Sequence, residues 1–121
     1  MGKPQLLNTV LNNKVVMPLL GLGVYDNTKT YKYFEGLNTT SYTYNPLTTS
    51  GALVAGVKLL GGHAVPIVGY INDATQPGGG VFVVENSWGK PWGNQGFFYL
   101  PYSVIQSTKV VPSGSLYVAI L

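Results

Sequence analysis

Three short apolar runs, separated by turns rich in glycine, constrain most strongly what this chain can fold into. They span residues 62–71, 80–86 and 96–101, and their β-branched and aromatic residues are typical of strands. Gly78-Gly79-Gly80 follows Pro77 and marks a turn between the first two runs. Consecutive strands joined by short turns pair antiparallel, so the sequence predicts an antiparallel sheet.

Two further runs extend this sheet, and one segment before it predicts a helix. Residues 4–12 place four apolar side chains at helical spacing and predict a short amphipathic helix. Residues 14–24 and 115–121 predict a first and a last strand, and Pro18 within the first indicates an edge position or a bulge. With no internal repeat or linker, all 121 residues form one predicted domain. Its class is mainly β (α+β): a twisted antiparallel sheet or half-open barrel with one short N-terminal helix.

The charge pattern argues against a nucleic-acid partner. Only 9% of the residues are charged, and the net charge of +3 comes from seven scattered lysines without any arginine. Nucleic-acid binding usually needs a clustered basic face. The longest apolar runs, residues 15–24 and 52–60, are too short to cross a bilayer, so no membrane span is expected.

The counts of cysteine and histidine limit the chemistry further. The chain has no cysteine, which excludes disulfides, thiolate metal sites and a thiol nucleophile within it. One histidine cannot build a multi-histidine metal site, so no metal is expected. The lack of cysteines and the absence of a signal-peptide pattern at the start favour an intracellular setting.

The segment 25–52 is polar and rich in tyrosine, and it is longer than most ordinary loops. One interpretation is a functional or binding segment. The other is a loop whose tyrosines pack their rings on the core and leave their hydroxyls in water.

The only histidine lies at the start of the 62–71 strand, where His63, Val65 and Ile67 share one face. A hairpin centred near residues 74–75 places His63 opposite Asn86. An asparagine carbonyl that accepts a hydrogen bond from one imidazole nitrogen fixes the tautomer, and the other nitrogen is left to exchange a proton with a thiol. For a histidine considered alone, the simpler interpretation is a polar niche without catalysis.

Two stretches around these residues resemble the motifs of the papain-like cysteine peptidases. Gly62-His63-Ala64-Val65-Pro66-Ile67-Val68-Gly69-Tyr70 is similar to the family's histidine motif. Residues 86–98, NSWGKPWGNQGFF, are similar to its asparagine motif. The resemblance covers essentially the whole chain and is closest to bacterial, archaeal or viral members. It implies the β-rich, C-terminal (right-hand) half of such a peptidase.

The resemblance implies a role for each matching position. His63 is expected to be the general base and thiolate partner, and Asn86 is expected to orient it. Trp88 is expected to shield that pair and to line the leaving-group side of the cleft. The expected substrate-flanking residues are Gly61, Gly62 and Ala64. The expected structural residues are Gly89, Trp92, Gly93 and Gly96. No metal or organic cofactor is implied.

The chain departs from the family in lacking the nucleophilic cysteine and the helical half that carries it. The resemblance therefore implies a half that is inactive alone and hydrolyses peptide bonds with a cysteine-bearing helical half as its partner. That partner is a separate chain, or a cleaved or omitted segment, and the substrate is a peptide or protein. Two alternatives stay open: a noncatalytic binding or scaffold module that uses residues 25–52, and an unrelated β protein.

Overall fold

The computed structural model describes residues 16–120, so the helix predicted for residues 4–12 lies outside the described part. The elements are β1 (Val16–Asn27), β2 (Val57–Asn72), β3 (Gly80–Glu85), β4 (Phe97–Pro101), the short helix α2 (Tyr102–Ile105) and β5 (Leu116–Ile120). The strands form one five-stranded sheet in the order β4-β3-β2-β1-β5. Every ladder is antiparallel, which confirms a mainly β fold with a twisted, unclosed sheet.

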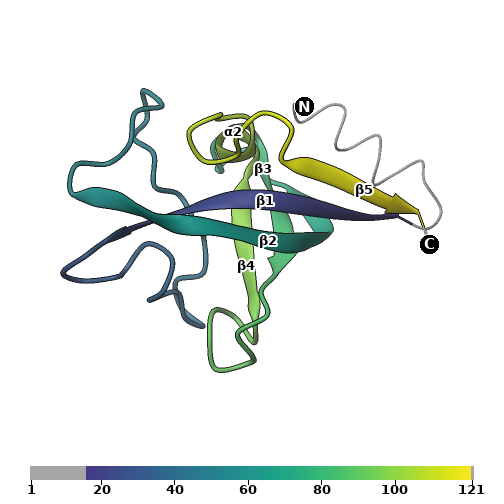
Figure 1. Ribbon diagram of the computed structural model, residues 1–121, viewed down its shortest axis with the longest axis horizontal. Coiled ribbons are helices and arrows are strands. Elements are labelled where there is room, and N and C mark those ends of the chain that lie inside the picture. The colour runs from purple at the N-terminus through teal and green to yellow at the C-terminus, as the bar shows by residue number, and fades with distance from the viewer. Residues whose placement is uncertain (1–15, 121) are drawn as a thin grey trace.

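The sheet has two parts that differ in direction. In Figure 1 the long strands β1 and β2 run across the molecule together with β5, and β3 and β4 cross them steeply. The strand β2 belongs to both parts, because it pairs with β1 on one side and with β3 on the other. The predicted strands were confirmed, although β2 begins at Val57 rather than at residue 62. The helix α2 was not predicted.

Two prolines lie where one ladder ends and the next begins. Pro18 pairs with Val118 of β5, and the ladder between β1 and β2 starts only at the next residue, Leu19, opposite Pro66. The ladder between β2 and β3 in turn starts at Ile67. Each proline is therefore paired on one side only, which is where a residue without a backbone N–H is tolerated. Although β1 is an inner strand of the sheet, Pro18 itself has a ladder partner on one side only, which agrees with the predicted edge position or bulge in that local sense.

Two β-bulges in β2 place apolar side chains outside the core. Leu60 is the extra residue at a register shift against β1, and Val68 is the extra residue at a shift against β3. The two side chains are 42% and 48% exposed. Bulges increase the local twist of a strand, so they explain how β2 turns from one part of the sheet to the other.

The core is aromatic, and the long segment 25–52 contributes to it. Phe34 and Tyr44 are fully buried, although they lie between β1 and β2 in the sequence. The Tyr44 hydroxyl donates a hydrogen bond to the Gly23 carbonyl (2.7 Å) and accepts one from the Tyr25 amide (2.8 Å). The packing of this segment on the core is thus confirmed for Tyr44, whereas its hydroxyl binds the backbone of β1 and not water. A binding role for the segment stays a prediction.

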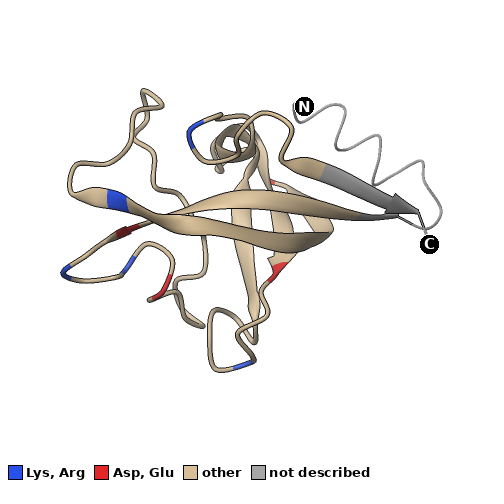
Figure 2. Ribbon diagram, in the orientation of Figure 1, with Lys and Arg blue, Asp and Glu red and all other residues tan. Residues whose placement is uncertain are grey.

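Charges are few and spread over loops and strand ends, and no face of the described part gathers one sign (Figure 2). Within that part, no helix is long and apolar enough to span a membrane.

The Tyr44 hydroxyl generates a prediction about stability. Tyr44→Phe leaves the Tyr25 amide without its acceptor and should lower the free energy of unfolding by about 1–3 kcal/mol. Burial also raises the pKa of Tyr44 above its ordinary value. The neutral phenol is therefore favoured by folding, and this contribution is lost as pH rises above about 10. Tyr44→Phe should weaken the alkaline loss of stability. Urea titrations at pH 7 and pH 11 measure both effects.

Tyr31→Phe is the matched control, because Tyr31 lies in the same segment and is 40% exposed. It should leave the urea midpoint unchanged at both pH values. Equal stability of the two variants would contradict the structural role of Tyr44.

Candidate active site

A single hydrogen bond joins the histidine and asparagine segments. His63 lies on β2 on the same face as the buried Val65 and Ile67, and Asn86 is the first residue after β3. The distance from Nε2 of His63 to Oδ1 of Asn86 is 2.7 Å. The contact expected between the two side chains is therefore confirmed.

The strand register behind that contact was predicted wrongly. Asn72 pairs with Gly80, so the hairpin is centred on residue 76 and not near residues 74–75. The seven-residue turn from Asp73 to Gly79 accounts for the difference, and the bulge at Val68 shifts the register back by one residue, to Ile67 opposite Val84. The regular ladder ends at Ile67, and His63 and Asn86 are not opposed within it. They meet through their side chains beyond the end of the ladder.

The backbone after Asn86 determines which way its amide points. The Ser87 amide nitrogen lies 2.8 Å from Oδ1 of Asn86, and a backbone N–H only donates. The atom that faces it must therefore be the amide oxygen. Since the same oxygen faces Nε2 of His63, that nitrogen must carry the proton. No hydrogen bond joins Nδ1 to a described residue, so the other ring nitrogen is left for chemistry.

An aromatic cluster surrounds the imidazole. The Trp88 ring is tilted by 38° to the His63 ring, with 5.6 Å between the centroids, and Trp88 is 46% exposed. Phe34 meets both rings edge to face, at 6.2 Å from His63 and 5.3 Å from Trp88. Trp88 therefore covers the imidazole from the solvent side, in agreement with its expected position, and Phe34 lies in the core.

Asn86 also carries an unsatisfied donor. The residue is 5% exposed, and its Nδ2 has no hydrogen-bond partner among the described residues. A buried N–H without an acceptor costs about 1–3 kcal/mol. No carboxylate in the described part hydrogen-bonds to His63, so the group that orients the imidazole is a neutral amide.

A cavity of about 290 Å³ opens beside His63. Gly61 and Gly62 line it, and a Cβ placed on either glycine would meet no atom within 4 Å. Leu59 and Pro112 provide apolar walls. Packing in the described residues therefore does not require glycine at either position. The role expected for both glycines beside a substrate stays a prediction. Ala64 is exposed but does not line this cavity.

The residues expected to be structural lie in the loop after Asn86. Gly89, Gly93 and Gly96 all have positive φ, and a Cβ on Gly93 would lie 2.6 Å from the Phe97 carbonyl oxygen. Trp92 is 9% exposed, and its indole Nε1 donates to the Phe34 carbonyl at 3.1 Å. The packing role expected for Trp92 agrees with this position.

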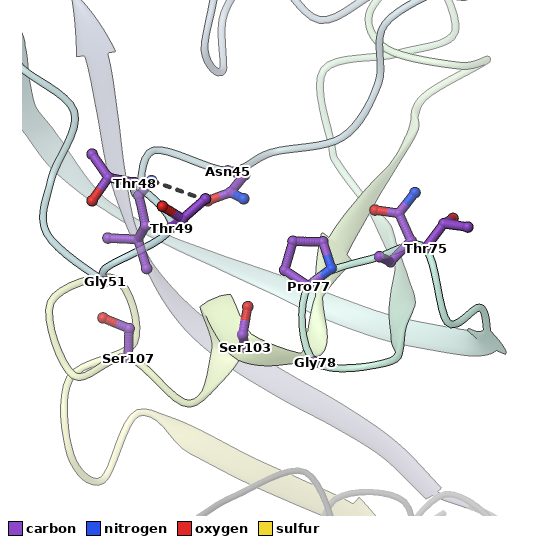
Figure 3. A pocket seen from close by; sticks show the side chains of 11 residues that line it. Asn45, Thr48, Thr49, Gly51, Thr75, Pro77, Gly78, Ser103 and Ser107 are labelled. Atoms are coloured by element: carbon purple, nitrogen blue, oxygen red, sulfur yellow. Dashed lines mark hydrogen bonds between the residues drawn. The ribbon is translucent and has the colours of Figure 1, made fainter.

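The largest cavity, about 520 Å³, has no part in this site (Figure 3). It lies between the 45–51 loop, the 75–78 turn and the segment around α2. Its polar lining consists of hydroxyls and amides, including Thr48, Thr75, Ser103 and Ser107, without a charged side chain. Of these two cavities, the smaller one is lined by His63.

Two residues of the site were not identified from the sequence. Ser87 acts through its backbone N–H, which any residue except proline supplies, so its side chain carries no signal. Phe34 lies far from His63 along the chain, and only the folded loop brings the two rings together.

The hydrogen bonds of Asn86 predict the tautomer of His63. NMR can test it directly, because the chain has a single histidine. In the neutral imidazole, ¹⁵N NMR should show the proton on Nε2 and an unprotonated Nδ1. Asn86→Ala removes the acceptor and should abolish the slowly exchanging Nε2–H signal.

Asn45→Ala is the control, because Asn45 also accepts from a backbone amide but lies in the largest cavity. It should leave the His63 signals unchanged. A proton on Nδ1 in the neutral wild-type ring would contradict the assigned tautomer.

Comparison with known proteins supports the same chemistry. The model of the papain family cysteine proteases matches residues 26–114. An uncharacterized peptidase C1-like protein of Acanthamoeba polyphaga mimivirus is 47% identical over 47 residues, which cover 38% of this chain and 13% of that protein. A gut-specific cysteine proteinase of Caenorhabditis elegans is 49% identical over 41 residues, covering 34% of this chain and 12% of that protein. The matches thus span a small part of these relatives. The chain belongs to the papain family of cysteine proteases.

Proposed function

We propose that this chain supplies the histidine and asparagine of a papain-type active site, whose nucleophilic cysteine comes from a separate cysteine-bearing half. The combined site hydrolyses peptide bonds. The observation that carries the proposal is the hydrogen bond from Nε2 of His63 to Asn86, because it leaves Nδ1 as the reactive nitrogen.

The proposed mechanism uses Nδ1 of His63 twice. It first holds the proton of the partner's thiol, so that the thiolate attacks the carbonyl carbon of the scissile bond. The same proton then passes from Nδ1 to the leaving amine, and an acyl-enzyme is left on the sulfur. In the second half, Nδ1 takes a proton from water as the water attacks the acyl carbon; the C–S bond then breaks, the carboxylic acid product leaves, and the thiolate and protonated imidazole are restored. Asn86 keeps the ring in place throughout, since its bond to Nε2 is never broken.

The surface around His63 supports an additional half that covers it. Leu59 is 59% exposed beside the small cavity, and the neighbouring Leu60 is 42% exposed. Trp88 adds a half-exposed indole on the solvent side of the imidazole. Apolar side chains gathered around a polar pair are typical of an interface.

The cavity beside His63 supports a peptide as substrate. Its volume of about 290 Å³ is near the lower end of ligand pockets, and it admits one amino-acid side chain. Leu59 and Pro112 give it apolar walls, and Lys109 and Tyr25 add polar groups, so the lining is mixed.

The test combines an active-site-directed thiol probe with substitution of the histidine. The native complex is isolated through this chain, labelled with the probe, and assayed with a fluorogenic peptide. His63→Ala should lower kcat/KM by about 10²–10⁴-fold, the range of general acid–base catalysis. Asn86→Ala should lower it less, because the imidazole is present but less well oriented.

Gln76→Ala is the control variant, because Gln76 lines the largest cavity and not the cavity beside His63. It should retain full activity. Unchanged turnover by the His63→Ala complex would refute the proposal. Capture of a partner without a reactive cysteine would favour the alternative of a noncatalytic binding module.

A further inference from the structure

We propose that the buried carboxylate of Asp26 is a positioning residue for the catalytic pair, acting through the loop of residues 27–37 and the ring of Phe34. The inference rests on the proposed function of His63. It concerns a charged group that the mechanism itself does not use.

Asp26 is fully buried near the end of β1 and is satisfied entirely by backbone amides. Its Oδ1 accepts from the amides of Asn27 (2.9 Å) and Tyr33 (2.8 Å). Its Oδ2 accepts from those of Phe34 (3.0 Å) and Glu35 (2.8 Å). A carboxylate has about four lone-pair positions, and here each oxygen has two donors.

This arrangement needs a carboxylate and not merely a polar side chain. The side chain of an Asp26→Asn variant would present one oxygen and one NH₂ group, so two backbone N–H groups would face donors instead of acceptors. The four bonds also hold the loop by both ends, because Asn27 begins it and Tyr33, Phe34 and Glu35 lie near its close. Asp26 therefore determines the path of the loop between β1 and the aromatic core.

Phe34 carries that constraint to the site. Its amide is held by Asp26, and its carbonyl accepts from the Trp92 indole at 3.1 Å. The backbone is thus fixed on both sides of a fully buried ring. A second bond, from the Gly93 amide to the Leu37 carbonyl (2.9 Å), joins the same loop to the loop that follows Asn86.

The ring of Phe34 supports the imidazole and its indole cover together. Its centroid lies 6.2 Å from that of His63 and 5.3 Å from that of Trp88, both nearly edge to face. A shift of Phe34 would therefore move both rings relative to Asn86. This path explains why a residue without contact to the imidazole affects its orientation.

The test uses the single histidine of the chain as its probe. The chemical shifts of the His63 ring protons depend on the positions of the Trp88 and Phe34 rings. In folded Asp26→Asn these shifts, and the NOEs from His63 to Trp88, should change. A loss of stability alone lowers the urea midpoint but leaves the shifts of the folded molecules as they are. In the cysteine-bearing complex, kcat should fall by about ten- to hundredfold, with a smaller change in KM.

Asp73→Asn is the matched control. One carboxylate oxygen of Asp73, Oδ1, also accepts two hydrogen bonds, from the Thr75 amide (2.9 Å) and the Thr75 hydroxyl (2.6 Å). Asp73, however, lies in the exposed turn between β2 and β3. It should leave the His63 shifts unchanged. Unchanged His63 shifts in folded Asp26→Asn would overturn the proposal.

Phe34→Leu provides the second variant, which decides the matter if Asp26→Asn does not fold. It keeps the backbone amide that Asp26 binds and removes the ring. Because removal of the Phe34 ring alters the His63 shifts by itself, the readout here is the set of NOEs from His63 to Trp88. These should change, and unchanged NOEs would refute the path through Phe34. Because the NMR measurements use this chain alone, they separate this proposal from the proposed function, which fails if no reactive cysteine accompanies the chain.

Discussion

The hydrogen bond between His63 and Asn86 is the interaction around which the site is arranged. The orientation of the Asn86 side chain is fixed first. The Ser87 backbone N–H can only donate a hydrogen bond, so the side-chain oxygen of Asn86 must face it. The proton on Nε2 follows from that orientation, and the availability of Nδ1 follows in turn. A backbone N–H thus determines the protonation pattern of a side chain on another strand.

The sheet is built so that these two side chains meet at its end. The strand β2 leaves β3 at Ile67 and joins β1 at Pro66, and proline is tolerated at this change of partner. The bulge at Val68 adds twist at the same point. His63 therefore extends beyond the β2–β3 ladder, toward the loop that begins at Asn86. The aromatic rings of Phe34 and Trp88 pack around the imidazole there.

Much of the fold and the site is readable from the sequence, because it is encoded locally. Alternating and β-branched residues predicted the strands, and the two motifs predicted that His63 and Asn86 would meet. The register was wrong because the hairpin is centred on residue 76, and the local pattern does not determine where within the 73–79 turn the centre falls. The role of Asp26 was not predicted either, since its partners are backbone amides that only a folded loop brings together. The substrate-flanking role that the family motif implies for Ala64 stays a prediction; Ala64 is exposed and does not line the cavity beside His63.

We propose that Nδ1 of His63 faces a cysteine supplied by another segment. A crystal structure of the complex isolated through this chain, with the cysteine unmodified, tests it most directly. We expect a cysteine Sγ within hydrogen-bond distance of Nδ1, with Nε2 still bound to Oδ1 of Asn86. A complex in which Nδ1 binds another group, or in which no cysteine lies near the imidazole, would contradict it.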